Sequence, residues 1–169
     1  MANKQLVLIR HAKSKYPIGV PDSDRPLSQR GVADAGAVAK WVDASGLRQR
    51  QVAVVVSSAR RTQETWSLIK GNGVDSIAKS EPQLYEATPE TIRSVIVATP
   101  PAVEVLIVIA HNPGLEDLAT SIASNPQSAA FQQMVGKYPT SGIAVFELID
   151  WKSLGAASAL LTDFVVPRG

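Results

Sequence analysis

Apolar residues in this chain gather in short unbroken runs that alternate with segments of helical period. The clearest runs cover residues 6–9 and 52–56, together with residues 103–110, in which Glu104 is the one polar residue. Such runs are typical of strands that are buried on both faces, as in a parallel sheet. A weaker segment at residues 76–80 predicts a short edge strand, which Pro82 closes. The pattern therefore predicts an α/β domain built on a buried sheet.

The first helix is predicted by its ends and by its apolar stripe. Ser28 is a favoured N-cap residue, and Gly46 is a favoured stop. The apolar residues between them recur at helical spacing and are Val32, Ala35, Ala39 and Val42. The segment before this helix, residues 11–27, is rich in proline and has no helical period, so we expect an ordered loop there.

Four later helices are predicted by capping and breaking signals. The first covers residues 60–69, after the caps Ser57-Ser58 and before the stop at 71–73. The second runs from Thr88-Pro89 to the break at 99–101. The third begins at Asn112-Pro113, and the fourth covers residues 129–135.

The last two strands, residues 143–149 and 157–166, are joined by a connection too short for a helical crossover. They predict an antiparallel pair at the end of the sheet. Together the elements predict a single domain over residues 1–169. Its fold class is α/β, a three-layer α/β/α sandwich with a mostly parallel central sheet, helices on both faces and an antiparallel C-terminal edge.

Composition narrows the class of protein. The chain has 169 residues, 45% of them hydrophobic, which is enough for a core without crosslinks. It has no cysteine, which excludes disulfides and thiolate metal sites, and its net charge of +2 does not favour a broad nucleic-acid surface. The apolar runs are far too short for a membrane span, and the N-terminus shows no signal-peptide pattern. We therefore expect a cytoplasmic protein that binds neither nucleic acid nor membrane.

Polar residues follow three of the predicted strands directly. Arg10 and His11 follow the first, Arg61 comes just after the second, and His111 follows the third. His11 and His111 are the only histidines in the chain. Because the C-terminal ends of parallel strands meet at one edge of a sheet, we expect these side chains to share a pocket. Arg25, in the predicted loop, is a further candidate for this pocket.

These residue types together indicate phosphate chemistry. A guanidinium offers a planar fork of donors that matches two phosphate oxygens, and helix N-termini add backbone N–H groups. A neutral histidine can attack phosphorus if its other ring nitrogen holds the proton, and a carbonyl that accepts from that N–H would fix this tautomer. A second histidine, if protonated, would stabilise the transferring phosphoryl group. We expect no metal or other cofactor, since arginines supply the charge.

Four motifs carry a resemblance to a known family. They are LIRHAKS at residues 8–14, DRPLSQRG at 24–31, SSARRTQET at 57–65 and HNPGL at 111–115. With these motifs the chain resembles the SixA-like phosphohistidine phosphatases. They form a small branch of the histidine phosphatase superfamily, which also contains the cofactor-dependent phosphoglycerate mutases. The resemblance implies a phosphoglycerate mutase-like fold and a metal-independent phosphatase.

The resemblance also implies a role for each candidate residue. His11 would be phosphorylated in a covalent intermediate. Arg10 and Arg61 would bind the phosphoryl oxygens, Arg25 would reach them from the loop, and His111 would complete the catalytic and substrate-binding pocket.

Two details of the motifs bear on the reaction. Arg61 is preferred to Arg60 because the family pattern places arginine immediately before a stretch such as Thr62-Gln63-Glu64-Thr65.

Ala12 replaces the glycine that is usual after the nucleophile in the mutases, and the chain has no long insertion that would form a lid. An open site favours hydrolysis over a mutase reaction.

The general acid is the least defined part of the expected site. Glu86, in the segment Leu84-Tyr85-Glu86-Ala87, is the candidate by position. The leaving group of phosphohistidine is an imidazole, which can depart neutral if its other nitrogen is already protonated. A weak or missing acid therefore costs less with that substrate than with a phosphate ester.

The residues leave the substrate open. The favoured substrate is phosphohistidine in a protein partner, such as a histidine phosphotransfer domain. The same residues also fit a phosphatase for small phosphorylated metabolites. A third hypothesis is a module that binds phosphorylated ligands without hydrolysing them, although binding alone would not need His11 as a nucleophile.

Overall fold

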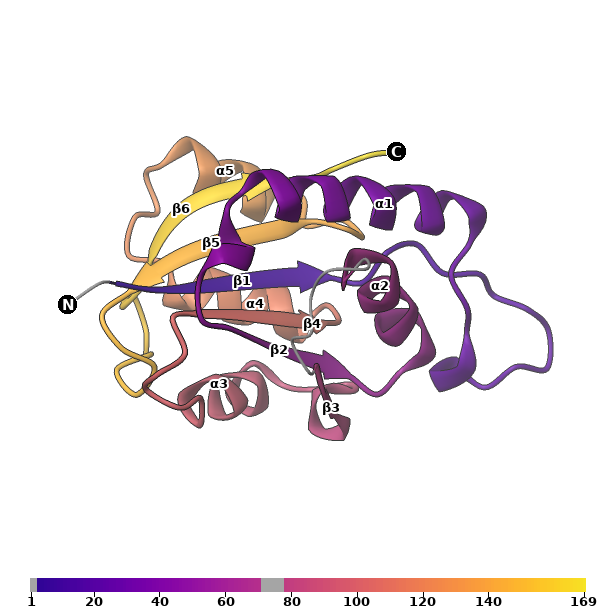
Figure 1. Ribbon diagram of the computed structural model, residues 1–169, viewed down its shortest axis with the longest axis horizontal. Helices are drawn as coiled ribbons and strands as arrows, with labels where there is room; N and C mark the ends of the chain where they lie inside the picture. The colour runs from indigo at the N-terminus through magenta and orange to yellow at the C-terminus, as the bar shows by residue number, and fades with distance from the viewer. Residues whose placement is uncertain (1–2, 71–77) are drawn as a thin grey trace.

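The computed structural model describes residues 3–70 and 78–169, which form a sheet with helices on both faces (Figure 1). The strands are β1 (Lys4–Arg10), β2 (Val52–Ser57), β3 (Lys79–Glu81), β4 (Val105–Ala110), β5 (Ile143–Leu148) and β6 (Leu160–Val165). The α-helices are α1 (Gln29–Ala44), α2 (Arg60–Lys70), α3 (Pro89–Val97), α4 (Gly114–Ile122) and α5 (Ala129–Gly136). Short 3-10 helices are η1 (Asp22–Asp24), η2 (Leu47–Gln49) and η3 (Pro82–Leu84).

The sheet is six-stranded in the described part of the chain, with the order β3-β2-β4-β1-β5-β6. The first four strands of this order are parallel, while β5 runs antiparallel to β1 and β6 antiparallel to β5. The predicted fold class, with its antiparallel C-terminal edge, is confirmed. Because β1, β2 and β4 are parallel neighbours, their C-terminal ends lie at one edge of the sheet.

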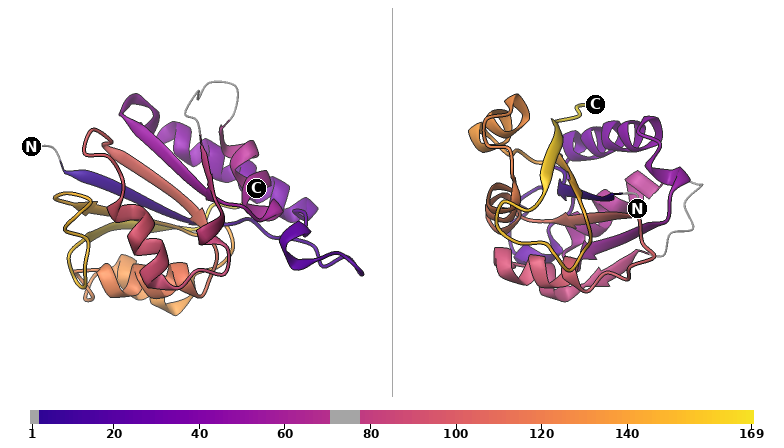
Figure 2. Two further views of the ribbon diagram at one scale, coloured as in Figure 1. Left: turned by 90° about the horizontal axis from the view of Figure 1, so that it is seen from below. Right: turned by 90° about the vertical axis from the view of Figure 1, so that its left-hand side faces the viewer.

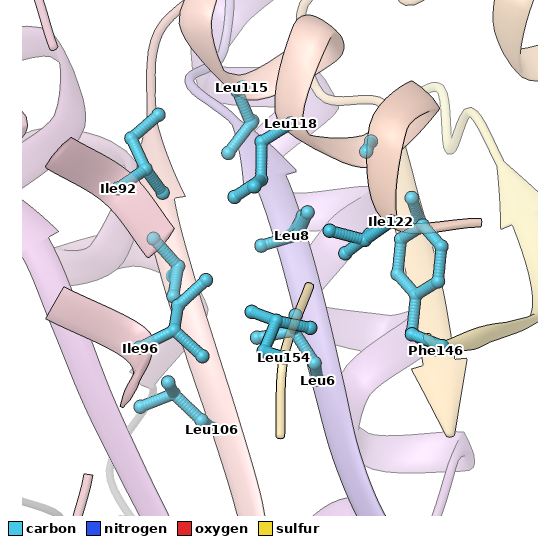
Figure 3. Packing of buried hydrophobic residues seen from close by; sticks show 14 of the residues in the cluster. Leu6, Leu8, Ile92, Ile96, Leu106, Leu115, Leu118, Ile122, Phe146 and Leu154 are labelled. Carbon is cyan, nitrogen blue, oxygen red and sulfur yellow. The ribbon is translucent and has the colours of Figure 1, made fainter. Parts of the chain in front are cut away.

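Both faces of the sheet are covered, which explains the unbroken apolar runs (Figure 2). Alternate residues of a strand point to opposite faces. Leu6 and Leu8 of β1 therefore pack in a cluster that includes side chains of α3, α4 and α5, as Figure 3 shows for α3 and α4. Val7 and Ile9 pack in a second cluster with side chains of α1 and α2. None of the described helices is long and apolar enough to cross a membrane.

The predicted stripe of α1 is wrong at one position. The N-cap is confirmed, since the Ser28 hydroxyl accepts from the Gly31 backbone N–H. However, Val32 is 47% exposed, and Gly31 takes the buried position instead. The reason is that the loop after β1 lies across this turn of the helix, where the Ser28 backbone N–H donates to the Lys13 carbonyl. A glycine allows this close contact.

The predicted start of α4 is also wrong. The helix begins at Gly114, and Pro113 holds the N-cap position without a side-chain hydrogen bond. The side chain of Asn112 does not cap the helix, because its Oδ1 accepts no hydrogen bond from the described residues, while its Nδ2 donates to the Tyr138 carbonyl and to Glu116. β4 begins at Val105, two residues later than predicted.

The last strand, expected from residue 157, begins later, at Leu160. Thr88 caps α3 by accepting from the Thr91 backbone N–H. The predicted edge strand at residues 76–80 is found as β3, and residues 76 and 77 lie outside the described residues. The predicted helix stop at residues 71–73 also lies outside them.

A pair of glycine substitutions in α1 tests how tightly the loop packs. A Cβ at Gly31 would overlap the carbonyl oxygen of Lys13, whereas a Cβ at Gly36 would meet open space. We expect Gly31→Ala to lower the free energy of unfolding by about 1–3 kcal/mol. Gly36→Ala should raise it by about 0.5–1 kcal/mol, because alanine favours the helix. Urea unfolding measures both, and equal effects of the two substitutions would contradict the packing described for Gly31.

Candidate active site

The edge formed by the C-terminal ends of the parallel strands brings the two histidines together. His11 follows β1 and His111 follows β4, and their ring centroids are 5.2 Å apart. Each side chain is largely buried, with 8% relative exposure. The His11 backbone N–H donates to the Ala110 carbonyl at 3.1 Å, which continues the pairing of the two strands up to the histidines. The expected shared pocket therefore exists.

The His11 ring is held in one tautomer. Its Nδ1 lies 2.8 Å from the Ala12 carbonyl oxygen, which can only accept, so Nδ1 carries the proton. The pKa of His11 is lowered to about 3, mainly by burial; the Ala12 carbonyl opposes this shift, while the nearby His111, Arg61 and Arg10 act in the same direction as burial. At neutral pH the ring is therefore neutral, and its Nε2 carries a free lone pair.

Two arginines are positioned beside the histidines by groups far away in the sequence. Arg61 donates from Nη1 to the Asp22 carbonyl oxygen at 2.8 Å and from Nη2 to the Asp22 carboxylate at 3.1 Å. Arg10 donates from Nη1 to the Tyr138 carbonyl oxygen at 2.9 Å. The Nε atoms of both arginines are buried and have no hydrogen-bond partner among the described residues.

Arg25 lines the same pocket, but its guanidinium is bonded to its own loop. It donates to the Lys15 carbonyl, the Ser14 hydroxyl and the Asp22 carboxylate, and it stacks on the Tyr16 ring at 3.5 Å. The structure therefore brings Arg25 to the rim of the pocket, where it orders the loop. Its direct contact with a phosphoryl group stays a prediction.

Asp22 joins the site although the sequence pattern did not single it out. Its carboxylate accepts from the Tyr85 hydroxyl at 2.7 Å, from Arg25 and from Arg61, and these contacts hold its pKa well below the usual range. The Tyr85 ring meets the His111 ring edge-on at 5.7 Å. An acidic residue in a proline-rich loop carries no local signal for this role, because two of its three partners, Arg61 and Tyr85, come from α2 and from the segment before α3.

His111 is bonded on one side only. Its Nε2 lies 2.7 Å from the Ser57 hydroxyl, and its Nδ1 is buried without a partner among the described residues. Burial lowers the pKa of His111 to about 4, with Arg61 adding to the shift and Asp22 opposing it. The ring is therefore neutral at pH 7 in the free pocket. Ser57 was expected as a helix cap, and instead it contacts His111.

Two adjoining cavities open at this edge. The smaller, about 190 Å³, contains both histidines and the three arginines at positions 10, 25 and 61 in its lining. The larger, about 530 Å³, shares Arg61 and His111 with it and extends past Glu86. Glu86 is exposed and lines the larger cavity but not the smaller one, so it lies outside the buried pocket. In residues 3–70 and 78–169, no group of three or more His, Cys, Asp or Glu side chains could hold a metal ion.

The lowered histidine pKa values predict how stability depends on pH. Both rings have a pKa near 6.5 in the unfolded chain and about 3 or 4 in the fold, so the unfolded state binds more protons between these values. The free energy of unfolding should therefore fall as the pH drops from about 6.5 towards 4, by up to about 1.4 kcal/mol per pH unit for each histidine.

Urea unfolding at a series of pH values measures this slope. In His11→Ala and His111→Ala the slope should decrease relative to the original protein, whatever the absolute stability of the variants. A slope that neither substitution changes would show that the histidines do not titrate as their burial requires.

Comparison with known proteins adds independent findings. Residues 6–88 match the model of the histidine phosphatase superfamily (branch 1). An uncharacterized protein of Mycobacterium tuberculosis is 36% identical over 163 residues, which cover 95% of this chain and 100% of the relative.

Solved structures agree with this match. A structure from Nakamurella multipartitia, described as that of a proposed SixA phosphohistidine phosphatase, is 26% identical with a TM-score of 0.85, covering 99% of this chain and 98% of the other. A structure from Agrobacterium tumefaciens with the same description is 27% identical with a TM-score of 0.78, covering 97% of this chain and 98% of the other.

Proposed function

The chain is a phosphatase that belongs to the histidine phosphatase superfamily, and on this premise we propose that it hydrolyses protein phosphohistidine through a phosphoryl intermediate on His11. The proposal rests on one observation above all. Three buried nitrogen atoms near His11 have no hydrogen-bond partner among the described residues, namely the donors Arg10 Nε and Arg61 Nε and the ring nitrogen Nδ1 of His111. Donors placed in this way suit the equatorial oxygens of a transferring phosphoryl group.

The proposed reaction has two displacements at phosphorus. In the first, His11 Nε2 attacks, a P–N bond to His11 forms, and the P–N bond to the substrate imidazole breaks. In the second, water attacks the phosphoryl group, one proton of the water is released, and the electron pair of the P–N bond returns to His11. Arg10 and Arg61 stabilise the phosphoryl oxygens in both steps, and no step requires a metal ion.

Phosphohistidine is proposed as the substrate for two reasons. Two solved structures that are 26% and 27% identical to this chain are themselves proposed to be phosphohistidine phosphatases. In addition, the candidate acid Glu86 is exposed and outside the buried pocket, an arrangement that suits a leaving group needing little protonation. The phosphorylated partner would be a protein that carries phosphohistidine, such as a histidine phosphotransfer domain.

A second candidate function is the hydrolysis of small phosphorylated metabolites. The larger cavity, at about 530 Å³, falls in the size range of small-molecule pockets and adjoins the two histidines. It could accept the remainder of such a substrate while the phosphoryl group occupies the smaller cavity.

A panel of substrates separates these functions. We expect a higher kcat/KM for a histidine-phosphorylated protein and for N-phosphoimidazole than for phenyl phosphate or sugar phosphates. Glu86→Gln should lower turnover of phenyl phosphate more than that of N-phosphoimidazole. A preference for a sugar phosphate would favour the metabolite phosphatase, and an equal loss on both substrates in Glu86→Gln would contradict the argument about the leaving group.

A further inference from the structure

Ser57 occupies a fixed and fully buried position beside the second histidine. It is the last residue of β2, has 0% relative exposure, and its Oγ lies 2.7 Å from His111 Nε2. Its carbonyl oxygen accepts from the Thr62 hydroxyl at 2.8 Å and from the Gln63 side chain at 2.7 Å. The start of α2 therefore holds Ser57 in place, so that its hydroxyl meets the ring from the neighbouring strand.

The hydrogen bonds available to Ser57 decide which ring nitrogen of His111 carries the proton. A hydroxyl donates one hydrogen bond, and the acceptor within reach of Ser57 Oγ among the described residues is His111 Nε2. The other contact of Oγ is the Ala59 backbone N–H at 3.5 Å, which is a donor. If Nε2 carried the proton, the buried Ser57 hydrogen would have no acceptor, which is costly. With the proton on Nδ1, the Ser57 hydroxyl donates to Nε2, and the Nδ1–H is the one group of this pair without a partner. With the proton on Nε2, both the Ser57 hydrogen and Nδ1 would lack a partner.

The tautomer matters because a neutral imidazole has a single N–H. Nδ1 is the ring atom that has no partner, and the His111 ring lies beside that of His11. His111 lines the smaller cavity and its Nε2 is bonded to Ser57, so with the proton on Nδ1 the single N–H of the ring is left for a ligand. With the proton on Nε2, it would present a lone pair to the phosphoryl oxygens and repel them.

We propose that Ser57 is a positioning residue that holds His111 in the Nδ1–H tautomer and so directs this N–H to the phosphoryl group beside His11. This inference rests on the proposed function for the identity of the ligand. The tautomer itself is a property of the free protein, and it can be tested without turnover.

The first test is the ¹⁵N NMR spectrum of the histidine rings at pH 7. We expect the original protein to show His111 protonated at Nδ1, and Ser57→Ala to shift the equilibrium towards Nε2. The Nε2–H form in the original protein, or the same tautomer in Ser57→Ala, would overturn the proposal. Neither result depends on whether phosphohistidine is the substrate.

The second test is the pH profile of N-phosphoimidazole hydrolysis. Ser57→Ala should lower kcat/KM by about 10- to 100-fold at pH 7. Losses of this size are typical when a hydrogen-bond partner that orients a metal-bound histidine is removed. The loss should shrink as the pH falls, because a protonated His111 carries an N–H on both nitrogens. The titratable and charged groups that face His111 are Arg61, Arg10, Asp22, His11 and Tyr85, and they are the same in the variant.

Two further variants separate positioning from folding. Ser57→Thr keeps the hydroxyl and should restore most of the activity. Thr99→Val removes another largely buried hydroxyl, on the segment after α3, and should leave kcat/KM unchanged. A loss in Ser57→Ala that is the same at every pH and is not restored by threonine would show a structural role only. If N-phosphoimidazole is not hydrolysed at all, the proposed function fails, while the NMR result still decides the role of Ser57.

Discussion

Replacing His11 by alanine is expected to abolish phosphatase activity, with kcat lower by about 10⁴-fold or more, because the variant has no nucleophile to accept the phosphoryl group. The ring is nearly buried, its Nδ1 proton is held by the Ala12 carbonyl, and its pKa of about 3 keeps Nε2 unprotonated at neutral pH. The measurement is steady-state hydrolysis of N-phosphoimidazole and phenyl phosphate by the purified variant.

The control for this variant is a comparison of its fold with that of the original protein. A circular dichroism spectrum and a cooperative urea transition like those of the original protein would show that the loss is chemical. Undiminished turnover in folded His11→Ala would exclude a phosphohistidine intermediate at this position.

Arg61→Ala is expected to lower kcat by about 10²- to 10³-fold, the loss typical of removing one donor that stabilises a developing charge. Both Nη atoms of Arg61 are held by Asp22, so the guanidinium is oriented before the substrate binds. Arg61→Lys should recover little of this activity, since an ammonium cannot reproduce the planar fork.

The neighbouring arginine is a matched control for this substitution. Arg60 is exposed, and its guanidinium forms an ion pair with Glu64 at 2.6 Å on the surface of α2. Exposed ion pairs of this kind contribute little to the stability of a fold. Arg60→Ala should therefore leave the protein folded and kcat nearly unchanged. Equal losses in Arg60→Ala and Arg61→Ala would show that general positive charge, and not the position of Arg61, supports the reaction.

Much of this site could be predicted from the sequence, because its central residues directly follow strands with a strong apolar signal. Arg10, His11 and His111 sit at the ends of runs that had to be buried strands. The parallel order of those strands then required the three side chains to meet. The carbonyl that fixes the His11 tautomer could also be anticipated, because Ala12 is the next residue along the chain.

The contacts that position these residues could not be predicted in the same way. Ser57 after a strand has the local pattern of a helix cap, and only the packing of β2 against β4 shows that His111 is its partner. The pairing of Asp22 with Arg61 joins a loop to a helix 39 positions away. Val32 fitted the helical period, yet the loop after β1 covers Gly31 instead. In each case the deciding contact lies between elements that are distant in the sequence.

Trapping the phosphorylated enzyme tests the central claim most directly. The protein is mixed with ³²P-labelled N-phosphoimidazole, quenched in alkali within the first turnover, digested and analysed by mass spectrometry. The proposed mechanism predicts a phosphoryl group on His11 that is stable in alkali and labile in acid, and that is absent in His11→Ala. An acid-stable phosphoryl group on another residue, or turnover without any phosphorylated enzyme, would contradict it.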